Sequence, residues 1–135
     1  MKNTILLTFI ITVFIYGCNS SDDSAIEPKK DILGKWELIQ QGTSLENLFD
    51  LEPAGYTEFL SESSYRDFDY ITEKFNDGDY TLNDSLLIYY YYAINQHDID
   101  TVSVRYYYRF KNSKTLILDI DASAIFRTFI YKKIN

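Results

Sequence analysis

Short runs in which hydrophobic and polar residues alternate fill most of the chain after residue 31. The clearest run lies between residues 102 and 111. Its apolar positions are Val102, Val104, Tyr106, Tyr108 and Phe110, and the positions between them are polar. Successive side chains of a strand point to opposite faces of a sheet, so this run predicts a strand with one face in a core and the other in water.

Comparable runs recur along the chain and are separated by short polar segments. The expected strands lie near residues 34–40, 56–60, 65–71, 80–82, 86–94, 102–111, 115–121 and 126–134. We expect turns at residues 83–84 and 112–114, and at 76–79, where Asp77-Gly78 is a strong hairpin signal. About eight antiparallel strands in meander order predict an all-β, up-and-down barrel, because closing the sheet removes its edges.

One segment departs from the strand pattern. Between residues 44 and 53, Leu45, Leu48 and Phe49 have helical spacing, and Ser44 is a suitable N-cap. We therefore expect one short helix after the first strand, lying over one mouth of the barrel.

The first residues follow a different pattern. Lys2 is followed by an apolar run over residues 5–16, which is shorter than the roughly 20 residues that span a bilayer. A basic lead, a short apolar run and a small residue at its end are typical of a cleaved secretory signal. The sequence therefore predicts a signal peptide over residues 1–17.

Ile15-Tyr16-Gly17-Cys18 resembles the lipobox of bacterial lipoproteins, and Cys18 is the only cysteine in the chain. The resemblance implies cleavage before Cys18 and acylation of that residue, as with palmitate, which would anchor the protein to the membrane of the cell envelope. The run Ser20-Ser21-Asp22-Asp23 is similar to the acidic surface-export signal of Bacteroidota-type lipoproteins, which implies the outer membrane and its surface; a solvated linker is the alternative reading. Residues 18–31 are then a lipidated cysteine and a flexible tether, and residues 32–135 are the barrel domain.

Gly34-Lys35-Trp36 at the entry to the first strand resembles the opening of lipocalin-like domains. The resemblance implies that Trp36 plugs one end of the barrel and that a basic residue of the last strand, Lys132 or Lys133, packs across it. A barrel of this size either is filled by side chains or holds one small ligand, such as a hydrophobic molecule, and the sequence leaves both open.

A second candidate surface combines tyrosine and arginine. If odd-numbered residues of strand 86–94 point outward, Tyr89 and Tyr91 lie beside Arg105, Tyr107 and Arg109 of the next strand. Tyrosine and arginine are enriched at binding hot spots, so this face would suit a protein or glycan partner. The alternative is a ladder of cross-strand pairs that only stabilises the sheet.

The net charge and the candidate catalytic residues restrict which functions we expect. The formal net charge of −7 argues against binding to nucleic acid. His97 is the only histidine and lies in an expected loop, and the carboxylates Asp119 and Asp121 share a face that we expect to be in solvent. We therefore expect no enzyme, no cofactor and no metal site, but a membrane-anchored, lipocalin-like binding lipoprotein. A surface protein with a filled barrel is the first alternative, and a small envelope hydrolase is the second.

Overall fold

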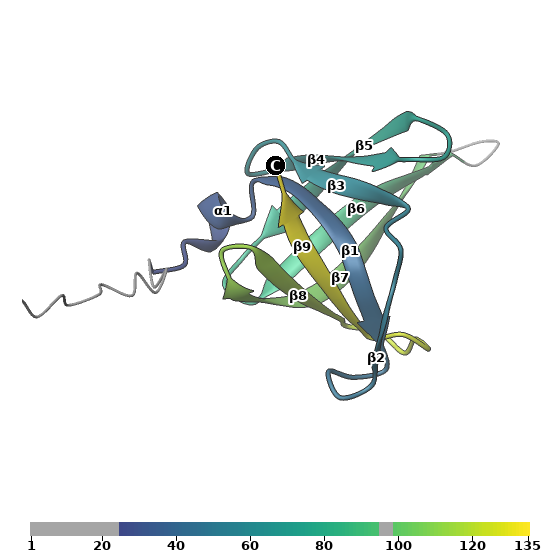
Figure 1. The fold of residues 1–135 in the computed structure, drawn as a ribbon. Coiled ribbons are helices and arrows are strands. Elements are labelled where there is room, and N and C mark those ends of the chain that lie inside the picture. Colours follow the sequence, from purple (N-terminus) through teal and green to yellow (C-terminus); the bar gives the residue numbers. More distant parts are fainter. Residues whose placement is uncertain (1–24, 95–98) are drawn as a thin grey trace, which may run out of the picture.

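The computed structural model describes residues 25–94 and 99–135, which form an antiparallel β-barrel (Figure 1). Its elements are α1 (Pro28–Asp31), β1 (Gly34–Gly42), β2 (Leu48–Asp50), β3 (Gly55–Phe59), β4 (Ser64–Asp69), β5 (Lys74–Leu82), β6 (Leu86–Ile94), β7 (Ile99–Asn112), β8 (Thr115–Ile120) and β9 (Thr128–Ile134).

The barrel wall has eight strands in meander order. From β3 to β9, each strand pairs antiparallel with the next, β1 pairs with β3, and β1 also pairs with β9, which closes the cylinder. The short strand β2 pairs only with the end of β1 and stands outside the closed ring. The predicted all-β, up-and-down barrel of about eight strands is confirmed.

The short helix lies in a different place from the one expected. The structure has α1 before the first strand, whereas residues 44–53 hold no helix and contain β2. Gly42 pairs with Leu48, and Gln40 Nε2 donates a 2.7 Å hydrogen bond to Asp50 Oδ1. Leu45 and Phe49 remain exposed, so the apolar face of a helix here would have had no core to pack against.

In the part of the chain that the structure describes, no helix has the length and apolar character needed to cross a bilayer.

The turn expected at residues 76–79 is also wrong, because these residues lie inside β5. The chain reverses earlier, at residues 70–73, where Asp69 Oδ1 accepts hydrogen bonds from the backbone N–H groups of Ile71 and Thr72. Gly78 instead faces Tyr65 across β4 and β5. A Cβ atom on Gly78 would lie 2.5 Å from the Tyr65 ring, so the glycine provides space for that ring.

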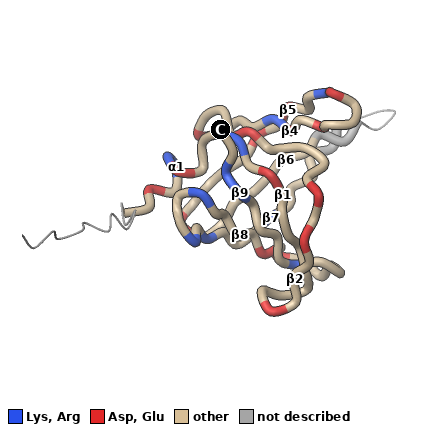
Figure 2. The backbone as a smooth tube through the Cα atoms, viewed as in Figure 1, with Lys and Arg blue, Asp and Glu red and all other residues tan. Residues whose placement is uncertain are grey.

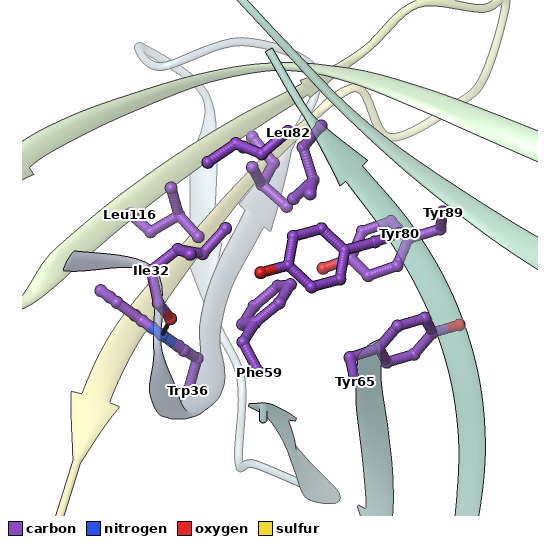
Figure 3. Packing of buried hydrophobic residues seen from close by; sticks show 10 residues of the cluster. Ile32, Trp36, Phe59, Tyr65, Tyr80, Leu82, Tyr89 and Leu116 are labelled. Carbon is purple, nitrogen blue, oxygen red and sulfur yellow. Dashed lines mark hydrogen bonds between the residues drawn. The ribbon is translucent and has the colours of Figure 1, made fainter. Parts of the chain in front are cut away.

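The densest part of the core lies at the end of the barrel next to α1. Its fully buried side chains are Ile32, Trp36, Leu87, Leu116 and Leu118. Figure 3 shows Trp36 beneath Ile32, with Phe59 and Tyr80 packed beside them. The phenol of Tyr80 donates a 2.6 Å hydrogen bond to the carbonyl of Ser61 in the β3–β4 loop. Because apolar side chains fill the interior here and polar tips bond to loop carbonyls, this end of the barrel is closed.

Candidate functional site

Trp36 is packed in the core at the end of the barrel next to α1. It is fully buried, and its Nε1–H donates a 2.6 Å hydrogen bond to the carbonyl oxygen of Ile32. Lys133 Nζ lies 5.1 Å from the centre of the Trp36 ring, so Lys133 of β9, and not Lys132, is the basic partner. Gly34 has a φ of 107°, which favours glycine, and the Lys133 stem crosses directly over it.

The opposite half of the barrel contains a cavity of about 460 Å³. Inward-facing side chains of five strands form its wall: Trp36, Leu38, Thr57, Asp67, Asn76 and Tyr131. The β2–β3 connection contributes Leu51, Glu52 and Ala54, and the remaining lining residues are Gly55, Tyr56, Phe68 and Asp69. Among the described residues, the barrel is therefore filled at one end and hollow at the other.

Tyr89 and Tyr91 of β6 lie on the inner face of the barrel wall, which corrects the expected outer patch. Tyr89 pairs with Val104 and is 7% exposed, and Tyr91 pairs with Val102 on the same face and is 42% exposed. The prediction that odd-numbered residues of this strand point outward is wrong. Both faces of the strand are apolar, so its own sequence does not set its orientation; pairing with the clearly alternating β7 does.

The other members of the expected patch do lie on the outer face. Tyr107 pairs with Leu86 and Arg105 with Ile88, away from Tyr89 and Tyr91. The guanidinium of Arg109 forms a 2.9 Å ion pair with Asp119. The five residues Tyr89, Tyr91, Arg105, Tyr107 and Arg109 thus do not share one surface.

The carboxylates of Asp119 on β8 and of Asp121, just after its end, differ in their surroundings. Asp119 accepts a 2.6 Å hydrogen bond from Thr128 Oγ1 in addition to the ion pair with Arg109. Its side chain is 32% exposed, so it is less open to solvent than expected. Asp121 is exposed, as expected. These contacts link β7, β8 and β9 on the outside of the barrel.

Inside the hollow half, one carboxylate lies among tyrosines. Asp67 of β4 is partly buried, and its Oδ1 accepts a 2.5 Å hydrogen bond from Thr57 Oγ1 on β3. Burial raises the pKa of the Asp67 carboxyl above 3.8, and the hydrogen bond from Thr57 lowers it by less. Burial raises the pKa of the phenols of Tyr65, Tyr89, Tyr91 and Tyr131, and the charge of Asp67 raises each of them further.

The tyrosines also contact one another. The Tyr89 ring lies 4.8 Å from the Tyr65 ring and 5.8 Å from the Tyr106 ring, measured between centroids, in edge-to-face geometry. The Tyr65 phenol donates a hydrogen bond to Tyr91, which raises the pKa of Tyr65 and lowers that of Tyr91. Burial raises the pKa of Tyr106 to about 12. These phenols are neutral at physiological pH and can donate hydrogen bonds.

Sequence reasoning missed Asp67 because aspartate in a strand is usually exposed. The usable signal was its position two residues after Tyr65, which places both side chains on one face. That signal was hidden because β4 carries aromatic residues on both faces: Phe68 points outward and packs on Tyr56 and Phe75.

Cys18, the predicted lipidation site, and His97, for which no catalytic or metal role was expected, lie outside the described residues. Within residues 25–94 and 99–135, no group of three or more histidine, cysteine, aspartate or glutamate side chains is placed to hold a metal ion. A scan against protein-family models and a search of curated proteins find no match to this chain.

Proposed function

We propose that the protein is a membrane-anchored binding lipoprotein that holds a small ligand in the hollow half of its barrel and performs no chemistry on it. The observation that carries this proposal is the contrast between the two ends. One end is plugged by Trp36, and the other contains a cavity of about 460 Å³. Ligand pockets in proteins commonly measure about 300–1,000 Å³, and eight-stranded barrels can hold one small molecule.

The lining of the cavity suits a ligand with both apolar and polar parts. Trp36, Leu38 and Tyr131 supply apolar surface, whereas Thr57, Asp67 and Asn76 supply hydrogen-bonding groups. A few polar groups among apolar walls are the usual composition of a small-molecule site.

The membrane anchor rests on the lipobox-like residues around Cys18. In the structure the chain enters the barrel through α1 at the plugged end (Figure 1). An anchor upstream of α1 would hold this end toward the membrane and leave the cavity facing away from it. Basic residues of α1, of the β7–β8 turn and of β9 gather toward the same end (Figure 2), where anionic headgroups would attract them.

The alternative of an external Tyr/Arg surface has less support. It needed five residues on one face, and Tyr89 and Tyr91 lie on the other. The outer guanidinium of Arg109 is already paired with Asp119, which fits a stabilising ladder. The internal site is therefore the better candidate.

A neutral fluorescent probe, N-phenyl-1-naphthylamine, tests whether the cavity binds small molecules. We expect one molecule to bind per barrel with a rise in its emission. The variant Asn76→Phe places a ring into the cavity from β5 and should abolish binding. Asp77→Phe adds the same ring at the next position, on the opposite face of β5 and outside the cavity lining, and should leave binding unchanged. Absence of binding to the wild-type protein, or equal binding by both variants, would reject the proposed function.

A further inference from the structure

The charged side chains that line the cavity indicate which class of ligand it would bind. Asp67 presents a carboxylate to the cavity and accepts a hydrogen bond from Thr57 Oγ1. The ion pairs formed within residues 25–94 and 99–135 use Lys29, Arg66 and Arg109, and none of them includes Asp67. A partly buried carboxylate without a cation is costly, so the empty site favours a positive charge beside it.

Other charges at the cavity have the same sign. Glu52 and Asp69 also line it, and none of the residues that line it is lysine, arginine or histidine. The backbone N–H groups of Thr72 and Ile71 lower the pKa of the Asp69 carboxyl, which keeps it ionised at neutral pH. A concave site with one sign of charge concentrates ligands of the opposite sign.

Aromatic rings complete this environment. Among the residues that line the cavity, Trp36, Tyr56, Phe68 and Tyr131 are aromatic. Aromatic faces attract cations, and cages of aromatic rings are a recurring solution for binding ammonium groups. The Asp67 carboxylate and the aromatic rings therefore both favour a positively charged ligand.

We propose that the ligand is an organic cation, an ammonium group on an aromatic or alkyl body, which pairs with Asp67 and packs against the rings of the hollow half. This inference rests on the proposed function, because it names the ligand class of the same cavity. An anionic ligand would meet three carboxylates and no base among the lining residues. A bare metal ion has no group of three ligands among the residues that the structure describes.

Three probes of nearly equal shape and different charge test the proposal: 2-phenylethylammonium, neutral 2-phenylethanol and anionic phenylacetate. Trp36 is the only tryptophan and lines the cavity, so its indole N–H resonance is a single reporter for NMR titrations. We expect the ammonium to bind at least about tenfold more tightly than the alcohol, which corresponds to a difference of about 1.4 kcal/mol. Phenylacetate should bind most weakly.

The variant Asp67→Asn separates charge from shape, because the amide oxygen can still accept the Thr57 hydrogen bond. It should remove the preference for the ammonium over 2-phenylethanol. Asp77→Asn makes the same change in net charge at an exposed site on β5 and should keep the preference. Circular dichroism of both variants checks that they are folded.

The outcomes separate two claims: that the cavity binds a small molecule, and that this molecule is a cation. If N-phenyl-1-naphthylamine binds and the ammonium shows no advantage over the alcohol, the cavity binds ligands and the cation is rejected. The cation is equally rejected if Asp67→Asn and Asp77→Asn reduce the preference to the same extent. If neither the naphthylamine nor any phenyl probe binds, the proposed function itself fails.

Discussion

Lys133 Nζ lies over the Trp36 ring and donates a 2.8 Å hydrogen bond to the carbonyl oxygen of Asp31. This one ammonium connects the last strand, the barrel plug and the end of α1. Asp31 and Lys133 are 102 positions apart in the sequence, so this hydrogen bond holds the first and last elements of the domain together at the closed end of the barrel.

Replacing Lys133 with methionine tests this contact. Methionine keeps the apolar stem but removes the cation over the ring and the donor to Asp31. We expect a loss of about 1–3 kcal/mol in the free energy of unfolding, measured by urea denaturation. Lys132→Met, at the neighbouring exposed position, should change stability by less than about 0.5 kcal/mol. Equal effects of the two substitutions would contradict the role of Lys133.

Trp36 should be the most sensitive single position of the closed end. Trp36→Ala removes a fully buried ring and should cost about 3–5 kcal/mol. Trp36→Phe should cost less, because an apolar ring still fills part of the space while the Ile32 carbonyl loses its donor. Thermal unfolding of the two variants gives this order; a similar midpoint for Trp36→Ala and the wild type would show that the plug is dispensable.

Gly78 should be required for the position of the Tyr65 ring. A methyl group at residue 78 would occupy the place of the ring, so Gly78→Ala should destabilise the protein by about 1–3 kcal/mol, as overpacking does. Asp77→Ala on the same strand is the control and should have little effect. In a double-mutant cycle, Tyr65→Ala should remove most of the penalty of Gly78→Ala. Additive effects would show that the glycine acts in another way.

The pH dependence of stability should reveal Asp67. Burial raises the folded-state pKa of this carboxyl above the unfolded value of 3.8, so the folded protein binds the additional proton between these two values. The contribution of Asp67 to the free energy of unfolding is therefore largest below pH 3.8 and is lost as the pH rises through the folded-state pKa. Asp67→Asn should remove this loss, and at neutral pH the unliganded variant should be more stable than the wild type.

The other titratable groups of the cavity do not alter the sign of this comparison. The phenols of Tyr65, Tyr89, Tyr91, Tyr106 and Tyr131 have raised pKa values and stay neutral throughout the acid range. The pKa of Asp69 is lowered, so its contribution to stability increases with pH. This contribution is the same in the wild type and in Asp67→Asn, so it does not change the difference between them. Urea midpoints at a series of pH values should therefore differ between wild type and Asp67→Asn with a gap that widens as the pH rises; a gap that narrows would contradict the account.

The proposed membrane anchor gives a separate prediction. Cys18→Ala should abolish labelling with palmitate and release the protein from the membrane fraction, because acyl chains contribute about 0.8 kcal/mol per buried CH₂. Retention of the variant on membranes would show that another feature attaches the protein.

The strand pattern predicted the barrel because most strands alternate clearly. In β7, polar and apolar positions are distinct, and Val104, Tyr106 and Tyr108 face inward as expected. In β6, leucine, isoleucine and tyrosine occupy both faces, so periodicity could not say which tyrosines point inside. Its pairing with β7 places Leu87 opposite Tyr106 and turns the odd-numbered positions inward.

Local turn signals were reliable only where no partner strand competed with them. Asn83-Asp84 does form a turn, with Asn83 Oδ1 accepting from the backbone N–H of Leu86. Asp77-Gly78 does not, because β5 gains a full set of pairs with β4 when the turn moves to residues 70–73. The cavity could not be predicted either, since Asp67 faces inward only by virtue of its pairing with Thr57 and Asn76.

Native mass spectrometry of the protein purified from its own membranes is the most direct test of the central claim, that the hollow half of the barrel holds a small molecule. The account predicts an acylated protein that carries one additional small molecule, released on denaturation and absent from Asn76→Phe prepared in the same way. Acylated protein with no bound molecule, or the same bound molecule in wild type and Asn76→Phe, would contradict it.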